Sequence, residues 1–109
     1  MEIDYQKVKI KIRHKYINYE TLWLKLLSNT TGRIANIPIY TKKFNYGDVV
    51  EFDPKTMEVK RLIFDGGYTQ TKFAKYEGNP ETAIKELGDK GYIVELWQGH
   101  LAVARAKQG

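Results

Sequence analysis

Residues 7–16 read K-V-K-I-K-I-R-H-K-Y, and this stretch decides the fold class. Successive side chains of a β-strand point to opposite faces, so a strand over about residues 6–16 places every cation of the stretch on one face. Same-face neighbours then lie ~6.6 Å apart, a spacing suited to phosphates or carboxylates. Two interpretations follow: a solvated edge strand whose lysines discourage pairing with other sheets, or an anion-binding surface. The cations concerned are Lys7, Lys9, Lys11, Arg13 and Lys15.

Period-two alternation and turn residues continue along the chain and predict further short strands. The sequence Asp65-Gly66-Gly67 predicts a hairpin that joins strands 57–64 and 68–76. One helix is predicted near residues 80–90, because Asn79 can cap it and Pro80 fits its first turn. The other predicted strands cover residues 21–27, 33–39, 49–52, 92–97 and 100–106.

These elements predict the α+β class, with about seven short, mostly antiparallel strands and one helix. The 109 residues suffice for one small domain with a modest core, so we assign residues 1–109 to a single domain. A layout with a β-rich half (1–54) and a strand–helix–hairpin half (55–109) is the alternative. Trp23 and Trp97 are expected to be core or half-core residues.

Composition limits the compartment and the partners. The formal net charge of +5 favours an anionic partner such as a nucleotide, a nucleic acid or an acidic protein. The absence of cysteine excludes a disulfide framework and a cysteine metal site. No apolar run approaches the ~18 residues of a membrane span. The first residues lack the pattern of a signal peptide, so we expect a cytoplasmic protein without a membrane partner.

Signals for catalysis are weak. His14 and His100 lie far apart in the sequence and belong to no paired ligand motif. The only serine, Ser28, lies in a polar turn and not in a nucleophile elbow. No glycine-rich phosphate loop surrounds Gly66-Gly67. We therefore expect no enzyme, no catalytic residue, no metal and no cofactor.

Signals for binding are stronger, because residues 60–76 interleave cations, hydroxyls and aromatic rings. A tyrosine that stacks, a hydroxyl that hydrogen-bonds and a cation that neutralises charge suit a nucleotide-like ligand. In the predicted strand 68–76, Tyr68, Gln70, Lys72 and Tyr76 share one face. The predicted ligand-binding residues are Arg33, Tyr46, Arg61, Tyr68, Thr69 and Lys72.

Several segments occur in an order that resembles a bacterial family catalogued only as a domain of unknown function, number 4265. That family usually has a G-H-S-T-x-R segment, where this chain has Tyr68 at the histidine and Lys72 at the arginine position. The resemblance implies the fold and a polar, cationic site without histidine chemistry, and it brings no established activity. The segments that carry it are Glu20-Thr21-Leu22-Trp23, Asn36-Ile37-Pro38-Ile39, Tyr46-Gly47-Asp48-Val49-Val50, Gly67-Tyr68-Thr69-Gln70-Thr71-Lys72, Ala83-Ile84-Lys85-Glu86-Leu87 and Gly91-Tyr92-Ile93-Val94-Glu95.

Three binding functions are consistent with this sequence, and a cryptic nucleotide hydrolase that turns over without metal is a fourth alternative. The first is a non-enzymatic protein that sequesters an anionic small molecule, such as a nucleotide immune signal bound by a phage-type anti-defence protein. A small domain has little room for a deep cleft, so a homo-oligomer is one way to complete such a pocket. The second is an immunity or antitoxin-type protein that binds an acidic protein through its basic first strand. The third is single-stranded nucleic-acid binding by the same strand.

Overall fold

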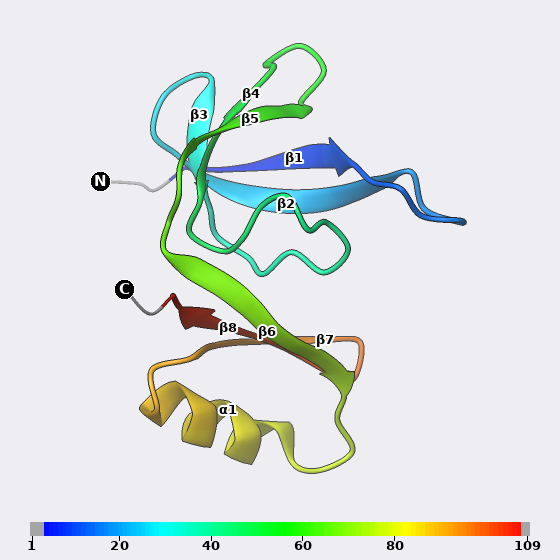
Figure 1. Cartoon of the computed structure of the whole chain (residues 1–109), viewed down its shortest axis with the longest axis vertical. Helices are drawn as coiled ribbons and strands as arrows, with labels where there is room; N and C mark the ends of the chain where they lie inside the picture. Colours follow the sequence, from blue (N-terminus) through cyan, green and yellow to red (C-terminus); the bar gives the residue numbers. More distant parts are fainter. Residues whose placement is uncertain (1–3, 108–109) are drawn as a thin grey trace.

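Eight strands and one helix form in the part of the chain that the structure describes. This computed structural model covers residues 4–107, without the side chains of Thr71 and Lys72. One antiparallel sheet has the order β1-β2-β3-β4-β5, and a second has the order β6-β8-β7 (Figure 1). The elements are β1 (Tyr5–Lys11), β2 (Tyr19–Leu26), β3 (Thr31–Ile34), β4 (Val49–Phe52), β5 (Val59–Phe64), β6 (Tyr68–Lys75), α1 (Pro80–Asp89), β7 (Ile93–Trp97) and β8 (His100–Ala106).

The first sheet encloses the larger core. It curls until the Lys9 N–H donates a hydrogen bond of 2.9 Å to the Met57 carbonyl, just before β5. Alternate residues of β1, β2 and β3 point into this curl, and Leu22 and Leu24 are fully buried. Burial of each such side chain contributes about 1.5–3 kcal/mol. The core cluster consists of Val8, Ile10, Leu22, Leu24, Ile34, Phe44, Val50 and Phe52.

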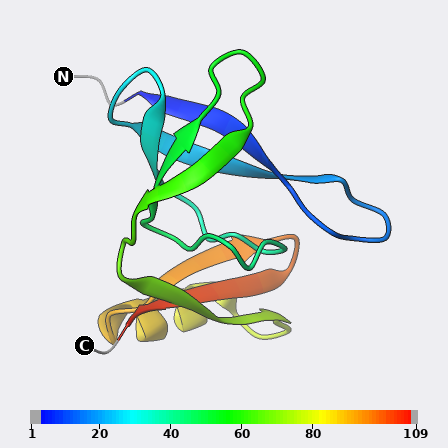
Figure 2. The same cartoon turned by 45° about the horizontal axis from the view of Figure 1, so that its top comes forward.

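The first strand is shorter than the sequence predicts. β1 ends at Lys11, which lies opposite Tyr19, the first residue of β2. Residues 12–18 belong to no strand and form a connection that projects from the body (Figure 2). The predicted row of five cations therefore contains only Lys7, Lys9 and Lys11, which we call the lysine row. Arg13 and Lys15 lie in the projecting connection.

The predicted hairpin of residues 57–64 and 68–76 is wrong. β5 pairs with β4, whereas β6 pairs with β8, so the chain changes sheets at residues 65–67. The Gly66 N–H is held by the Asp48 carboxylate, and Gly67 has a φ of 85°. These contacts direct the chain into the second sheet. The boundary between the sheets therefore follows β5 and does not lie near residue 54.

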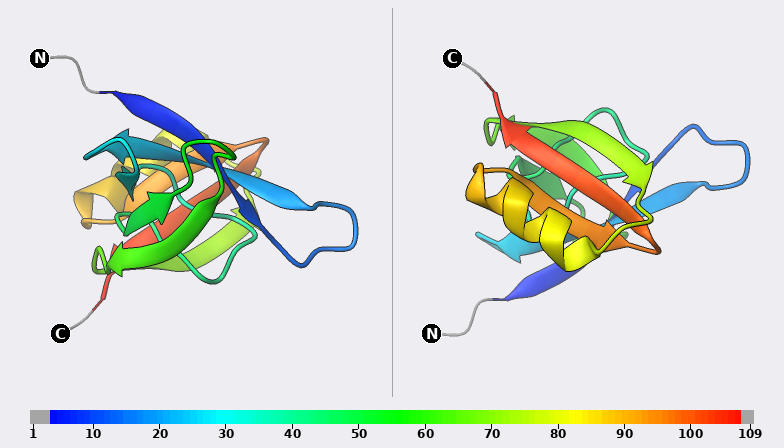
Figure 3. Two further views of the ribbon diagram at one scale, coloured as in Figure 1. Left: turned by 90° about the horizontal axis from the view of Figure 1, so that it is seen from above. Right: turned by 90° about the horizontal axis from the view of Figure 1, so that it is seen from below.

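The second sheet is covered on both faces. α1 packs on the face that points away from the first sheet (Figure 3). The connection between β3 and β4, residues 35–48, brings Ile37 onto the opposite face, against Ala102 and Ala104. The predicted helix start is confirmed, because the Asn79 side chain accepts a 2.9 Å hydrogen bond from the Glu81 N–H. Together the layers form one compact α+β domain, as predicted.

The described residues contain no helix long and apolar enough to cross a bilayer. Helix α1 has ten residues.

Candidate functional site

Two carboxylates hold the segment between β3 and β4 in place between the two sheets. We call this segment, residues 35–48, the connection 35–48. The buried Glu20 carboxylate accepts hydrogen bonds from the backbone N–H groups of Ile39 (2.5 Å), Tyr40 (3.0 Å) and Thr41 (2.8 Å). From the second sheet, both Glu95 oxygens accept from the Ile37 N–H, at 2.9 and 2.7 Å. Burial raises the pKa of Glu95, although the hydrogen bonds from Ile37 offset part of the rise. The connection is thus fixed by both layers.

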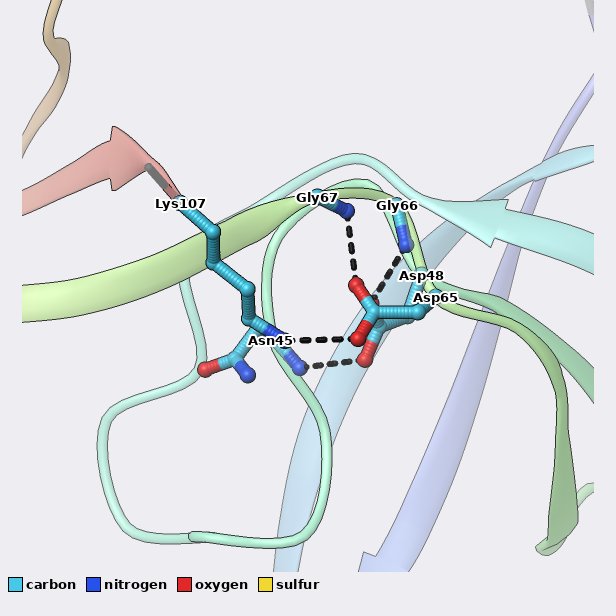
Figure 4. A network of polar contacts seen from close by, with 6 residues as sticks. All are labelled: Asn45, Asp48, Asp65, Gly66, Gly67 and Lys107. Carbon is cyan, nitrogen blue, oxygen red and sulfur yellow. Dashed lines mark hydrogen bonds and ion pairs between the residues drawn. The ribbon is translucent and has the colours of Figure 1, made fainter. Parts of the chain in front are cut away.

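A third carboxylate fixes the end of the connection against the crossing between sheets (Figure 4). Asp48 accepts hydrogen bonds of 2.9 Å from the N–H groups of Asn45 and Gly66. A Cβ atom at Gly66 would lie 2.2 Å from the carbonyl carbon and oxygen of Gly47, so only glycine fits there. Asp48 is therefore a turn residue, as its position after Gly47 indicates, and it also joins the two layers.

The exposed Asp65 lies beside this turn. Its carboxylate accepts hydrogen bonds from the Lys107 ammonium group (2.6 Å) and from the Gly67 N–H (2.7 Å). The hydrogen bond from Lys107, followed by that from Gly67, lowers the pKa of Asp65 below its ordinary value. This pair ties the residue after β8 to the start of β6.

A cavity of about 450 Å³ opens where these fixed segments meet. It brings together Arg33, Tyr46 and Tyr68, three of the six residues predicted to bind a ligand. They come from β3, the connection 35–48 and β6, so only the tertiary fold unites them. We call it the tyrosine cavity; its lining is Tyr5, Lys25, Arg33, Ile34, Ala35, Tyr46, Gly47 and Tyr68.

Two cations in the tyrosine cavity face each other across a strand pair. Lys25 on β2 lies directly opposite Arg33 on β3. Like charges in this position repel each other. Arg33 Nη1 donates a 2.9 Å hydrogen bond to the Gly47 carbonyl, and neither cation belongs to an ion pair among the described residues. An anion bound between them would remove the repulsion.

Three tyrosines supply the aromatic surface. The rings of Tyr46 and Tyr68 meet edge to face, with their centroids 5.2 Å apart. Burial raises the pKa of Tyr46, and the neighbouring Tyr68 and Glu95 raise it further. The Tyr46 hydroxyl is therefore neutral at physiological pH and can donate a hydrogen bond. Tyr5 completes the group from β1.

Arg61 and Thr69, two further predicted ligand-binding residues, do not line the tyrosine cavity. Arg61 lies on β5, where its Nε is 3.2 Å from a Glu51 oxygen in an exposed ion pair. Thr69 is half-buried on β6. A register shift between Gln70 and Lys72 interrupts the alternation of β6, so the backbone positions of Tyr68 and Lys72 no longer share a face. The Lys72 side chain lies outside the described residues, and its role stays a prediction.

The lysine row lies on the outer face of the first sheet. Lys7 Nζ lies 5.7 Å from the centre of the Trp23 ring, and Lys9 Nζ lies 4.8 Å from the Tyr19 ring. The cations thus alternate with aromatic rings of β2. The contact of these lysines with aromatic rings cannot be predicted from the sequence alone, because it depends on the register of β1 against β2.

The sequence pattern does not identify two of the residues that line the tyrosine cavity. Lys25 and Tyr5 lie opposite each other, one on β2 and one on β1. The alternation of β2 places Lys25 on the exposed face, but it does not show that β3 brings Arg33 beside it.

Within residues 4–107, no group of three His, Asp or Glu side chains is placed to hold a metal ion.

Comparison with known proteins found no matching family model, no matching curated protein and no matching solved structure.

Proposed function

We propose that this protein binds an anionic, aromatic small molecule, a nucleotide, in the tyrosine cavity and releases it unchanged. One observation carries the proposal: Lys25 and Arg33, a pair of like charges without an acidic partner among the described residues, converge with three tyrosines on one cavity. Small-molecule sites typically enclose ~300–1,000 Å³ and combine apolar walls with a few polar groups. The cavity volume of about 450 Å³ falls within that range.

Each part of a nucleotide has a partner in this arrangement. Lys25 and Arg33 would neutralise the phosphate, and guanidinium groups bind phosphate through two parallel N–H donors. Tyr68 or Tyr46 would stack on the base, and the Tyr46 hydroxyl would donate a hydrogen bond. A single chain supplies all of these groups, so the proposed pocket does not need a second copy.

The lining of the tyrosine cavity supports binding without turnover. Among the described residues, no histidine, aspartate, glutamate, serine or cysteine lines the tyrosine cavity. General acid–base catalysis near neutral pH most often uses a histidine or carboxylate within hydrogen-bond reach of the substrate. The nearby Asp48 carboxylate is already engaged by two backbone N–H groups. The biological role that we propose is sequestration of a nucleotide signal, such as an immune signal held by a phage-type anti-defence protein.

Isothermal titration calorimetry at low salt tests this proposal with a panel of mononucleotides, cyclic mononucleotides and cyclic dinucleotides. We expect heat with at least one nucleotide, and a loss of about tenfold or more in affinity for Lys25→Gln, because charge-assisted hydrogen bonds contribute about 1.5–3 kcal/mol. Lys60→Gln removes an equal charge from β5 and should leave the affinity unchanged. No heat with any member of the panel would refute the proposal.

A further inference from the structure

A second cavity, of about 430 Å³, lies on the outer face of β2, between the two sheets. Four aromatic residues line it: Tyr19 and Trp23 from β2, Tyr40 from the connection 35–48, and Trp97 from β7. We call it the aromatic cavity. Among the described residues, it shares no lining residue with the tyrosine cavity.

The two tryptophans of the aromatic cavity are accessible. Trp23 and Trp97, expected to be core or half-core residues, are 45% and 41% exposed. Burying such rings normally stabilises a protein, so two exposed tryptophans on one cavity indicate a surface that a ligand covers. The wall also contains the carboxylates of Glu20 and Glu95. Their charge disfavours an anion inside the cavity and favours a flat, neutral group.

Cations gather next to the aromatic cavity. A hollow of about 250 Å³ is lined by Lys11 and Arg13 from the β1 side, and by Lys42 and Lys43 from the connection 35–48. We call it the cationic hollow. None of these four cations belongs to an ion pair between residues that the structure describes. Tyr40 lines both the cationic hollow and the aromatic cavity, so the two are neighbours.

The lysine row borders the same cavity from β1. Lys7 and Lys9 lie over the rings of Trp23 and Tyr19, which line the aromatic cavity. A flat aromatic site is thus flanked by cations at Lys7 and Lys9 and by the cationic hollow. This arrangement complements a chain in which neutral aromatic groups alternate with anions.

We propose that the aromatic cavity and the cationic hollow bind single-stranded nucleic acid. An unpaired base enters the aromatic cavity and stacks on Trp23 or Trp97, while neighbouring phosphates contact the cationic hollow and the lysine row. Sequence-tolerant binding of single strands combines these two elements, base stacking on aromatic rings and a cationic track for the backbone. A duplex hides the faces of its bases, so it can use the cations alone.

Fluorescence anisotropy with labelled single strands of about ten nucleotides and a duplex of equal length tests this inference. We expect the single strand to bind more tightly than the duplex and to quench tryptophan fluorescence. If the protein neutralises three or four phosphates, the logarithm of its association constant should fall with the logarithm of salt with a slope of roughly −2 to −3.

Four variants separate the contributions. Trp97→Ala should weaken single-strand binding about tenfold, because stacking is lost. Lys42→Glu with Lys43→Glu should weaken binding by at least about tenfold and reduce the salt slope. Lys55→Glu with Lys60→Glu makes the same change of net charge outside both sites and should have a much smaller effect. Lys25→Gln, in the tyrosine cavity, should leave single-strand binding intact, which distinguishes the two proposals.

Three results would each overturn the inference. The first is equal affinity for the duplex and the single strand. The second is unchanged single-strand binding by Trp97→Ala. The third is competition by polyglutamate as effective as that by unlabelled single strand, because it would assign the cations to an acidic protein.

Discussion

Lys25 on β2 and Arg33 on β3 lie directly opposite each other in the antiparallel first sheet. Both side chains line the tyrosine cavity, and neither meets an acid in an ion pair within the described residues. A sheet gains nothing from two cations in this position, because like charges opposite each other destabilise it. The arrangement therefore favours a ligand function over a structural one.

This relationship predicts opposite effects of one substitution on stability and binding. Lys25→Gln should raise the free energy of unfolding of the free protein by about 0.2–1 kcal/mol at low salt, while it weakens nucleotide binding. The gain should shrink as added salt screens the repulsion. Urea unfolding at low and high salt measures it, with Lys60→Gln as the control. A less stable Lys25→Gln protein would show that the two cations do not repel each other.

The close approach of Gly66 to Gly47 predicts a large loss of stability for Gly66→Ala. The new Cβ atom would lie 2.2 Å from the Gly47 backbone, which would have to move together with Asp48. We expect a loss of about 3 kcal/mol or more. Gly88→Ala is the matched control, because among the described residues nothing beyond the adjacent backbone of α1 lies within 4 Å of its added Cβ. It should stabilise the protein by about 0.5–1 kcal/mol. Similar urea midpoints of unfolding for Gly66→Ala and Gly88→Ala would contradict this account.

Removal of the Glu20 carboxylate should release the connection 35–48. Glu20→Ala leaves three backbone N–H groups without their acceptor, and we expect a loss of about 3 kcal/mol in the free energy of unfolding. Amide hydrogen exchange should also accelerate at Ile39 and Thr41. Thr21→Ala, at the adjacent exposed position, should change stability by less than about 0.5 kcal/mol. Unchanged exchange in Glu20→Ala would show that other contacts hold the connection.

The Asp65–Lys107 ion pair predicts a dependence of stability on acid pH. The pKa of Asp65 in the folded protein is lowered, first by the hydrogen bond from Lys107, so the folded state binds this proton less tightly than the unfolded state. Its contribution to stability is complete above the ordinary pKa of 3.8 and is lost as the pH falls through the lower folded value. The difference in Tm between the wild type and Asp65→Asn should therefore narrow in that range. A difference that stays constant down to the lowest accessible pH would refute the assignment.

Local patterns in the sequence predict most elements but not their pairing. The alternation of β1 identifies the buried Val8 and Ile10, and Asn79 identifies the start of α1. The segment Asp65-Gly66-Gly67 has the composition of a hairpin turn, yet Gly66 is needed because the backbone of Gly47 approaches it closely. Such an approach between segments far apart in the sequence leaves no periodic signal. The fold class is therefore predictable, whereas the division into two sheets is not.

Contacts between segments far apart in the sequence also decide which of the predicted site residues come together. The chemistry of Arg33, Tyr46 and Tyr68 predicts a binding site, and the fold brings these three residues together. The predicted hairpin places Arg61 near Tyr68. Since that hairpin does not form, Arg61 lies in the other sheet beside Glu51.

Residues in the motifs that resemble the family of unknown function have structural roles in this chain. Three carboxylates accept hydrogen bonds from backbone N–H groups: those of Glu20, Asp48 and Glu95. The Asn36 side chain accepts a 2.7 Å hydrogen bond from the backbone N–H of Trp23. All four residues position the connection 35–48. The motifs therefore indicate how the cavity is built more directly than they indicate what binds in it.

Calorimetric titration of the nucleotide panel into the wild-type protein and Lys25→Gln tests the central claim most directly. We predict saturable heat for the wild type with at least one nucleotide, and affinity reduced about tenfold or more when one of the two opposed cations is lost. Equal affinities of the two proteins for every nucleotide that binds, or no heat from either protein, would contradict the claim.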